Sequence, residues 1–259
     1  MKKIVVVLLL FTAFQVKSQE YQVLHVKGEI VRVDDGSLLK PGDKITGEMQ
    51  LRFKTKDAMA AVLSAEKGRY IIKVTDNTAN QSDLIYVLKS AVSPVRGGMS
   101  SRAAGINNSI DFKLYFDEAP YVWAGDHIRL KVSSYAFPMN DRRFFFVRYG
   151  INDEVVNKKL DFDDDVLIFD KNTLFTVDEN PVNPGDIDHY ELYYYNSANE
   201  ESVLLTDIEF VLIDKKTLKE LYDQYQDFSE DAYYDIADIL SNIYGKCDPL
   251  QIRYNLKNQ

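Results

Sequence analysis

The chain has 259 residues, which allows one large or two small domains, and a hydrophobic content of 46% rules out general disorder. Its formal net charge of −9 argues against nucleic acid as a partner, because an acidic surface repels a phosphate backbone. The only cysteine, Cys247, excludes an intramolecular disulfide. We expect its thiol to be isolated and partly buried, with an intermolecular bridge as the alternative.

The first residues have the pattern of an export signal. Lys2 and Lys3 precede an apolar run over residues 4–14, and Val16 and Ser18 fit a small-residue cleavage site. The run is shorter than the ~20 apolar residues that a membrane-spanning helix needs. We predict a signal peptide cleaved after Ser18, and therefore a location in the periplasm, at the cell surface or outside the cell. The alternative is a retained anchor or a buried first strand.

Short apolar runs broken by turn signals follow the signal peptide. Asp34-Asp35-Gly36-Ser37 and Lys40-Pro41-Gly42-Asp43 are turn sequences, and residues 51–55 alternate in polarity as a strand does. Residues 57–65 are rich in Ala and Met and fit either a helical turn or a strand. Further strands are predicted over residues 69–74 and 84–88.

This region resembles the FecR-type β domain. The resemblance covers roughly the first quarter of the chain and rests on Val26-Lys27-Gly28, Gly36 to Ile45 with its Leu-x-x-Gly-Asp-x-Ile pattern, Leu51-Arg52-Phe53, residues 58–62 and Gly68-Arg69-Tyr70. FecR-type domains are periplasmic and take part in protein–protein signalling without catalysis. Full FecR regulators carry a cytoplasmic sigma-binding segment and a membrane anchor in place of a cleavable signal. The resemblance therefore implies a fold and a manner of use, but not sigma-factor regulation.

Residues 93–105 have the composition of a flexible linker. The stretch is rich in Gly and Ser, and its charges are Arg96 and Arg102. A long loop inside one domain is the alternative, although such loops are uncommon.

Seven runs with strand character over about a hundred residues then resemble an immunoglobulin-like sandwich. They cover residues 110–116, 128–132, 144–149, 155–160, 166–169, 190–195 and 203–213. Pro184-Gly185 followed by Tyr190 resembles the tyrosine corner of such sandwiches. Trp123 lies outside an obvious third strand, and the cysteine pair of antibody domains is absent.

The last part of the chain contains two apolar stripes at helical spacing. The first consists of Leu218, Leu221, Tyr222 and Tyr225, and the second consists of Ile236, Ile239, Leu240 and Ile243. Asp214 and Ser229 are candidate N-caps, and Gly245 with Pro249 marks a stop. We expect a helical hairpin whose stripes pack on the sandwich, with a partner protein as the alternative docking surface.

The predicted fold is therefore mostly β, with two β domains and a short helical end. The predicted segments are a signal peptide (1–18), a FecR-like β domain (19–92), a linker (93–105), an Ig-like β-sandwich (106–214) and C-terminal helices (215–259).

One acidic cluster is the only candidate metal site. Asp161, Asp163 and Asp165 copy the first three ligand positions of an EF-hand loop. The copy then fails, because Val166 stands where Gly is needed and Asn172 replaces the bidentate Glu. The pattern favours a solvated hairpin turn over a calcium site, and we predict no other metal and no cofactor.

Catalytic signatures are missing from the sequence. His25, His127 and His189 are isolated, without metal-ligand spacing and without a Gly-x-Ser-x-Gly elbow. We predict that the chain is not an enzyme. An unrecognised hydrolase is the alternative, and a deep pocket joining a histidine to a carboxylate would favour it.

Two aromatic triplets, residues 144–146 and 193–195, place rings on both faces of their predicted strands. One face serves the core, and the other can form a binding platform. Arg142-Arg143 beside the first triplet is predicted to be a solvated strand start.

The leading hypothesis is an exported, non-catalytic interaction or structural module of the bacterial cell envelope. It would be an accessory of a secretion, surface or transport assembly, with an envelope protein as its partner and no integral membrane segment after cleavage. The alternative is a carbohydrate- or peptide-binding module, which a clustered strip of exposed aromatic side chains would favour.

Overall fold

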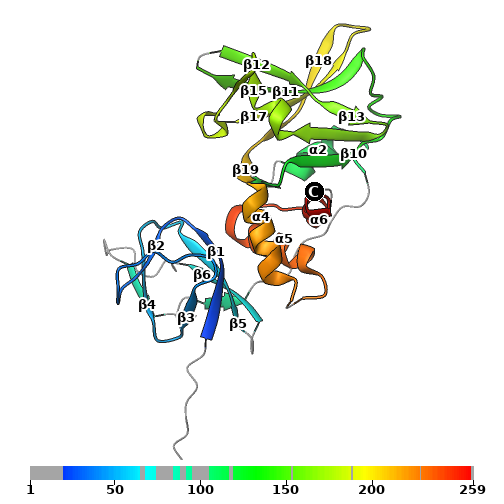
Figure 1. Ribbon diagram of the computed structural model, residues 1–259. Helices are drawn as coiled ribbons and strands as arrows, with labels where there is room; N and C mark the ends of the chain where they lie inside the picture. Colours follow the sequence, from blue (N-terminus) through cyan, green and yellow to red (C-terminus); the bar gives the residue numbers. More distant parts are fainter. Residues whose placement is uncertain are drawn as a thin grey trace, which may run out of the picture.

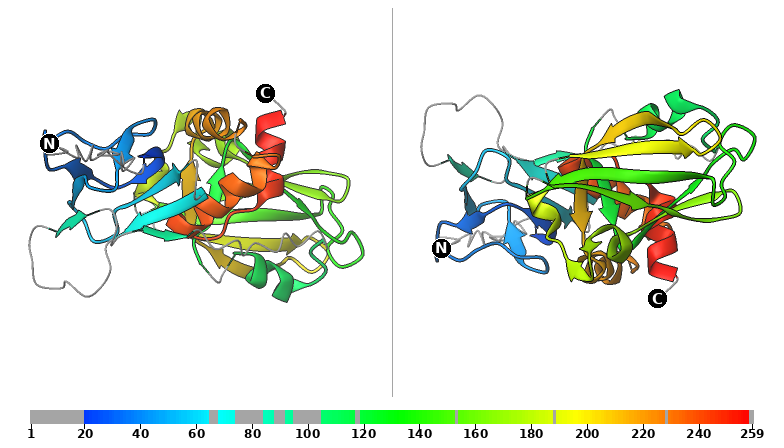
Figure 2. Two further views of the ribbon diagram at one scale, coloured as in Figure 1. Left: turned by 90° about the horizontal axis from the view of Figure 1, so that it is seen from below. Right: turned by 90° about the horizontal axis from the view of Figure 1, so that it is seen from above.

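The structure is a computed structural model that describes residues 20–64, 68–73, 84–87, 92–94, 105–116, 119–152, 154–187, 189–227 and 229–257. The fold is mostly β, as predicted. A first β module lies at one end, a second lies at the other, and a layer of helices lies between them (Figures 1 and 2). No helix within the described residues has the length and apolar character needed to cross a membrane.

The first module contains a five-stranded sheet and a three-stranded sheet, both antiparallel. Its strands are β1 (Glu20–Lys27), β2 (Ile30–Arg32), β3 (Lys44–Thr46), β4 (Gln50–Phe53), β5 (Met59–Ser64), β6 (Gly68–Lys73), β7 (Leu84–Val87) and β8 (Val92–Pro94). The strand orders are β3-β1-β5-β6-β8 and β2-β4-β7. Both predicted turns are present, and Gly36 and Gly42 adopt positive φ there.

Three strands of the five-stranded sheet, β1, β5 and β6, contribute buried side chains to cores on both faces. On β5, Ala60 and Val62 enter the core of the first module, whereas Ala61 between them packs toward the helices. A strand buried on both faces has a continuous apolar sequence with no alternation. This burial explains why residues 57–65 fitted either a helical turn or a strand, and the structure shows a strand.

The second module is a β-sandwich with two short helices. Its elements are α2 (Ser109–Phe116), β9 (Tyr121–Ala124), β10 (His127–Lys131), β11 (Arg143–Ile151), β12 (Glu154–Lys159), β13 (Asp161–Asp163), β14 (Val166–Asp170), α3 (Lys171–Leu174), β15 (Thr176–Val177), β16 (Asn180–Pro181), the 3-10 turn η2 (Pro184–Asp186), β17 (Tyr190–Asn196), β18 (Glu201–Ile208) and β19 (Phe210–Ile213). A three-stranded sheet, β10-β14-β13, and a four-stranded sheet, β12-β11-β17-β18, contribute to one hydrophobic core.

The strand predicted over residues 110–116 is wrong, because α2 occupies this segment. Its apolar residues alternate in sequence, which suggests a strand, yet the helix buries only Phe112 and Phe116, four residues apart. The Asn108 Oδ1 accepts hydrogen bonds from the backbone N–H groups of Ile110 and Asp111. This local cap favours a helix at the position where alternation predicted a strand.

The predicted strand over residues 203–213 is divided in two at Glu209. Its second part, β19, leaves the four-stranded sheet and pairs in parallel with β9. On β9, Tyr121 and Trp123 enter the sandwich core, whereas Val122 and Ala124 pack toward the helices. The β9–β19 pair therefore separates two hydrophobic cores.

Three helices follow, where the sequence predicted two: α4 (Lys215–Tyr225), α5 (Ala232–Tyr244) and α6 (Pro249–Lys257). Asp214 caps α4 as predicted, whereas the cap residue of α5 is Asp231 and not Ser229. Gly245 ends α5 in a conformation with φ of 138°, and a Cβ there would lie 2.2 Å from the Pro120 carbonyl oxygen. The predicted stop is confirmed, because α5 ends at Tyr244 before Gly245. Pro249 also begins α6, which the sequence did not predict; proline suits the first turn of a helix.

The apolar stripes of α4 and α5 pack within the chain. They form a shared core with Ile213 of the second module and with Leu24, Ala61 and Ile71 of the first module. The sequence predicted docking on the sandwich alone and did not include the first module as a second docking surface.

The predicted signal peptide lies outside the described residues, and so does most of the predicted linker. The β8 strand extends to Pro94, two residues into the segment assigned to that linker.

Candidate binding surface

The outer face of the four-stranded sheet carries a row of aromatic side chains. Phe145 of β11 enters the sandwich core, and Tyr194 of β17 packs against that core. The residues next to them in sequence face the other side of the sheet, because side chains alternate along a strand. These residues form the cross-strand pairs Phe144–Tyr195 and Phe146–Tyr193, which lie on the outer face. The ring centroids are 5.1 Å and 5.0 Å apart, and the second pair is stacked with an interplanar angle of 7°. The prediction that the two triplets place rings on both faces is confirmed.

Two cations lie over these rings. The Arg148 guanidinium lies 4.5 Å from the centroid of Tyr193, and the Lys159 ammonium lies 4.7 Å from that of Phe144. Arg148 donates from Nε to the Asn157 Oδ1 at 3.0 Å and from one terminal nitrogen to the Tyr193 hydroxyl at 3.3 Å. These hydrogen bonds fix the guanidinium in place on the ring.

The surface continues to the edge strand β18. Leu204 pairs with Tyr193 across the strands and is 44% exposed. The Tyr193 hydroxyl donates to the Glu191 carboxylate at 3.2 Å, and partial burial, followed by the nearby Glu191 charge, raises the pKa of Tyr193. We call Phe144, Phe146, Tyr193, Tyr195, Arg148, Lys159 and Leu204 the aromatic face.

The sequence did not predict that Arg148, Lys159 and Leu204 belong to this face. Their membership depends on strand pairing: Lys159 lies opposite Phe146, and Leu204 lies opposite Tyr193. The sequence does contain a signal for Arg148: it follows Phe144 and Phe146 at alternate positions of one strand, so the three side chains share a face. Arg142 is exposed immediately before β11, as predicted, whereas Arg143 begins β11 half-buried and donates from Nε to the Asn196 Oδ1 at 3.3 Å.

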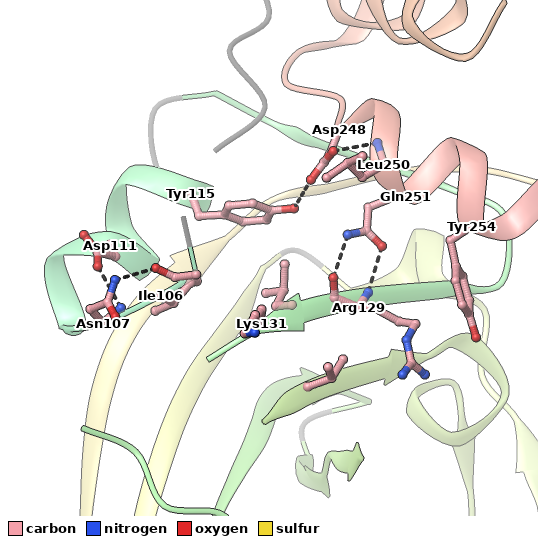
Figure 3. A pocket seen from close by; sticks show the side chains of 13 residues that line it. Ile106, Asn107, Asp111, Tyr115, Arg129, Lys131, Asp248, Leu250, Gln251 and Tyr254 are labelled. Carbon is pink, nitrogen blue, oxygen red and sulfur yellow. Dashed lines mark hydrogen bonds between the residues drawn. The ribbon is translucent and has the colours of Figure 1, made fainter. Parts of the chain in front are cut away.

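A separate pocket of about 410 Å³ lies between α2, β10 and α6 (Figure 3). Its walls combine the apolar side chains of Ile106 and Leu250 with Tyr115, Lys131 and Asp248. The volume is within the range of small-molecule sites. The sequence did not predict this pocket, because its walls come from four segments that are distant in sequence.

A chain of hydrogen bonds borders this pocket. The hydroxyls of Tyr115 and Tyr121 are 2.8 Å apart, and the Tyr115 hydroxyl donates to the Asp248 carboxylate at 2.8 Å. Burial, followed by neighbouring charges including Asp248, raises the pKa values of both tyrosines well above their ordinary value. Both therefore stay protonated at neutral pH and join α2, β9 and α6, which is a structural role.

On another side of the pocket, side chains of α6 cover the backbone edge of β10. The Gln251 side-chain amide accepts from the Arg129 N–H at 2.8 Å and donates to the Arg129 carbonyl at 2.7 Å. The Asn255 amide makes the same two kinds of hydrogen bond with the backbone of His127. Two side chains one helical turn apart thus occupy the edge of β10 opposite β14, as a neighbouring strand would.

The three aspartates of the candidate calcium site lie in the β13–β14 hairpin. Asp163 pairs with Arg129 at 3.2 Å, and Asp165 pairs with Lys131 at 3.3 Å, whereas Asp161 is exposed. No group of three or more His, Cys, Asp or Glu side chains in the described ranges is placed to hold a metal ion. Two of the three carboxylates therefore neutralise cations of β10.

The three histidines have separate surroundings. His25 is buried against Tyr244, and His189 is exposed. His127 Nε2 lies 3.0 Å from the Asp170 carboxylate, but neither residue lines the pocket between α2 and α6. That pocket does not join a histidine to a carboxylate, the arrangement that would have favoured a hydrolase.

Cys247 is 1% exposed, more buried than predicted, and burial raises the pKa of its thiol. A thiol in this position is not accessible for the intermolecular bridge that was the alternative.

Comparison of the chain with models of protein families, with curated proteins and with solved structures finds no match.

Proposed function

We propose that this chain is an exported, non-catalytic interaction module whose aromatic face binds a protein partner of the cell envelope. The observation that carries the proposal is the aromatic face itself: two cross-strand ring pairs, two cations over them and an exposed leucine at the sheet edge. Tyr, Phe and Arg are enriched at protein interfaces, and Tyr and Arg also at the energetic centres of these interfaces.

The ring geometry favours a protein over a carbohydrate. A sugar stacks on a free aromatic face, but the rings of Phe146 and Tyr193 are stacked on each other. The Arg148 guanidinium also lies over Tyr193, and Lys159 lies over Phe144. Phe146 is only 8% exposed, but the side chains of a protein can contact the half-buried rings beside it and the exposed Leu204, so we favour the protein over the carbohydrate alternative.

Two resemblances support a role in binding. We infer that the second module is Ig-like, because in its sheet orders strands β10, β14 and β13 take the places of B, E and D, and strands β12, β11, β17 and β18 those of C′, C, F and G. The Tyr190 hydroxyl donates to the Pro184 carbonyl at 3.5 Å, the contact of a tyrosine corner. We infer that the first module is FecR-like from the sequence pattern. Both kinds of domain serve protein–protein contacts.

The inference of export rests on the N-terminal pattern alone. The charged start, the apolar run and the small residues at Val16 and Ser18 predict a mature chain that begins at Gln19. N-terminal sequencing of the protein from the envelope fraction would identify Gln19 as the first residue. An intact Met1 in that fraction would contradict cleavage.

The binding proposal is tested by site-specific photo-cross-linking in cells of the source organism. A photoreactive amino acid at Leu204 probes the aromatic face, and one at Tyr135, which is 97% exposed and lies outside it, is the matched control. We expect a discrete cross-linked protein from position 204 and none from position 135. The absence of any adduct at position 204, or the same adduct at both positions, would contradict the proposal.

A further inference from the structure

We propose, as an extension of the proposed function, that the partner is an acidic protein segment. It places a carboxylate beside Arg148 and Lys159 while its apolar side chains cover Tyr195 and Leu204. The inference combines the charges of the aromatic face with the division of that face into a cationic half on β11 and β12 and an apolar half on β17 and β18.

The cationic half has donors left for a ligand. Arg148 uses Nε and one terminal nitrogen in hydrogen bonds, and no described residue accepts from its other terminal nitrogen. No carboxylate among the described residues lies within ion-pair distance of Arg148. A guanidinium held by two neutral partners is preorganised to bind a carboxylate.

Lys159 is similarly available. Its ammonium lies over Phe144, and its nearest described carboxylate is that of Asp141, at 3.9 Å. The Asp141 side chain is fully exposed, so this ion pair contributes little and is easily exchanged. Lys159 and Phe146 are cross-strand partners, and Arg148 follows Phe146 by two residues, so both cations border the same ring.

Three other arginines pair with carboxylates of the chain. Arg32 pairs with Asp43, Arg69 with Asp235, and Arg129 with Asp163. Arg148 has no such ion pair among the described residues, although the chain has a net charge of −9. A complementary surface therefore brings negative charge to this half of the face.

The apolar half of the aromatic face favours a protein over an acidic polysaccharide as the partner. This half contains the Glu191 carboxylate, which lies opposite Arg148 across the strands without an ion pair and accepts a hydrogen bond from the Tyr193 hydroxyl. The half-buried Tyr195 on β17 and the exposed Leu204 on the edge strand β18 present carbon surface to solvent. Aliphatic or aromatic side chains can cover this surface, whereas a uronic acid polymer has none to offer.

The test uses the full mature chain and three polymers as probes: a random glutamate–tyrosine copolymer, a lysine–tyrosine copolymer and polygalacturonate. Binding is followed through backbone amide chemical shifts at about 0.01 M and about 0.15 M ionic strength. We expect the glutamate–tyrosine copolymer to shift amides of β11, β12, β17 and β18, more weakly at the higher salt. The other two polymers should leave these amides unchanged.

Variants assign the effect to the two cations. Arg148→Gln combined with Lys159→Gln should weaken binding of the acidic copolymer about tenfold or more and remove most of its salt dependence. Arg148→Lys combined with Lys159→Arg keeps the charge and should keep the salt dependence. Lys113→Gln, at an exposed position on α2, is the control and should bind as the wild type does. Thermal melting of each variant confirms that it is folded.

Three outcomes would overturn the inference: no shift on these strands with the acidic copolymer, an unchanged affinity in the double glutamine variant, or equal shifts with polygalacturonate, which would indicate an acidic polysaccharide. The proposed function fails separately. If position 204 cross-links to a protein but the acidic copolymer does not bind, only the acidic character of the partner is refuted.

Discussion

At the scale of single residues, His25 connects the first module to the helices through a buried polar contact. The side chain is 6% exposed, and its Nε2 lies 2.8 Å from the hydroxyl of Tyr244 on α5. The Lys27 ammonium lies 5.4 Å from the centroid of the same tyrosine ring. Burial lowers the pKa of His25, so the folded chain holds this imidazole neutral.

The lowered pKa predicts a loss of stability in mild acid. The neutral histidine contributes its full stability above the unfolded pKa of about 6.5, and this contribution is lost as the pH falls below that value, because the unfolded chain takes up the proton more readily. We expect the melting temperature to fall less between pH 7.5 and pH 5.5 in His25→Gln than in the wild type. His189→Gln, at an exposed position, is the control. Identical pH profiles for wild type and His25→Gln would contradict the assignment.

At the scale of elements, α6 covers the free edge of β10 with two side-chain amides. Gln251→Ala leaves the N–H and C=O of Arg129 without their partners. We expect the free energy of unfolding to fall by about 1–3 kcal/mol and the Arg129 amide to exchange faster with solvent. Arg253→Ala, at an exposed position on the same helix, is the matched control. Unchanged exchange at Arg129 would show that α6 does not protect this edge.

The core between the helices and the two modules is tested by a buried charge. Ile239 on α5 is 0% exposed, whereas Tyr234 on the same helix is 42% exposed. Ile239→Asp should lower the stability by about 3 kcal/mol or more and reduce the yield of soluble protein, while Tyr234→Asp should have little effect. Thermal melting compares the two. An Ile239→Asp variant that melts like the wild type would mean that this core is not formed.

Element prediction from the sequence succeeded where the local periodicity matched the element and failed where it did not. The strands around Phe145 and Tyr194, the turns at Gly36 and Gly42 and the stripes of α4 and α5 follow local periodicity, and the structure contains them. In α2, the alternation of apolar residues predicted a strand, but the cap at Asn108 favours a helix there. The β9–β19 pair is buried on both faces, so it has no periodicity that separates strand from helix.

At the scale of the whole molecule, the helices join the two β modules. The core around α4 and α5 takes Leu24 and Ile71 from the first module and Val122 and Ile213 from the second. The ion pair between Arg69 and Asp235, at 2.7 Å, lies at the same junction. The two modules are therefore held by more than the connecting chain.

This arrangement changes the expected result of limited proteolysis. The Gly- and Ser-rich composition around Arg96 and Arg102 predicts tryptic cleavage between the modules. We expect the two fragments to elute together in size-exclusion chromatography after cleavage, because the shared core stays buried. Separation of the fragments without denaturant would contradict the packing of the helices on the first module.

The aromatic face could be predicted only in part. The triplets around Phe145 and Tyr194 placed rings on an outer face, because strand side chains alternate. The neighbours Lys159 and Leu204 join the face through pairing between strands that are distant in sequence, which local patterns do not determine.

The most direct test of the central proposal, that the aromatic face binds a protein, is the amount of partner that co-purifies with tagged Leu204→Glu from envelope extracts. This position is 44% exposed at the sheet edge, so the variant should melt like the wild type. Tyr135→Glu serves as the control. We predict that Leu204→Glu loses the partner cross-linked from position 204, while Tyr135→Glu retains it. A folded Leu204→Glu variant that retains this partner at the wild-type level would contradict the proposed function.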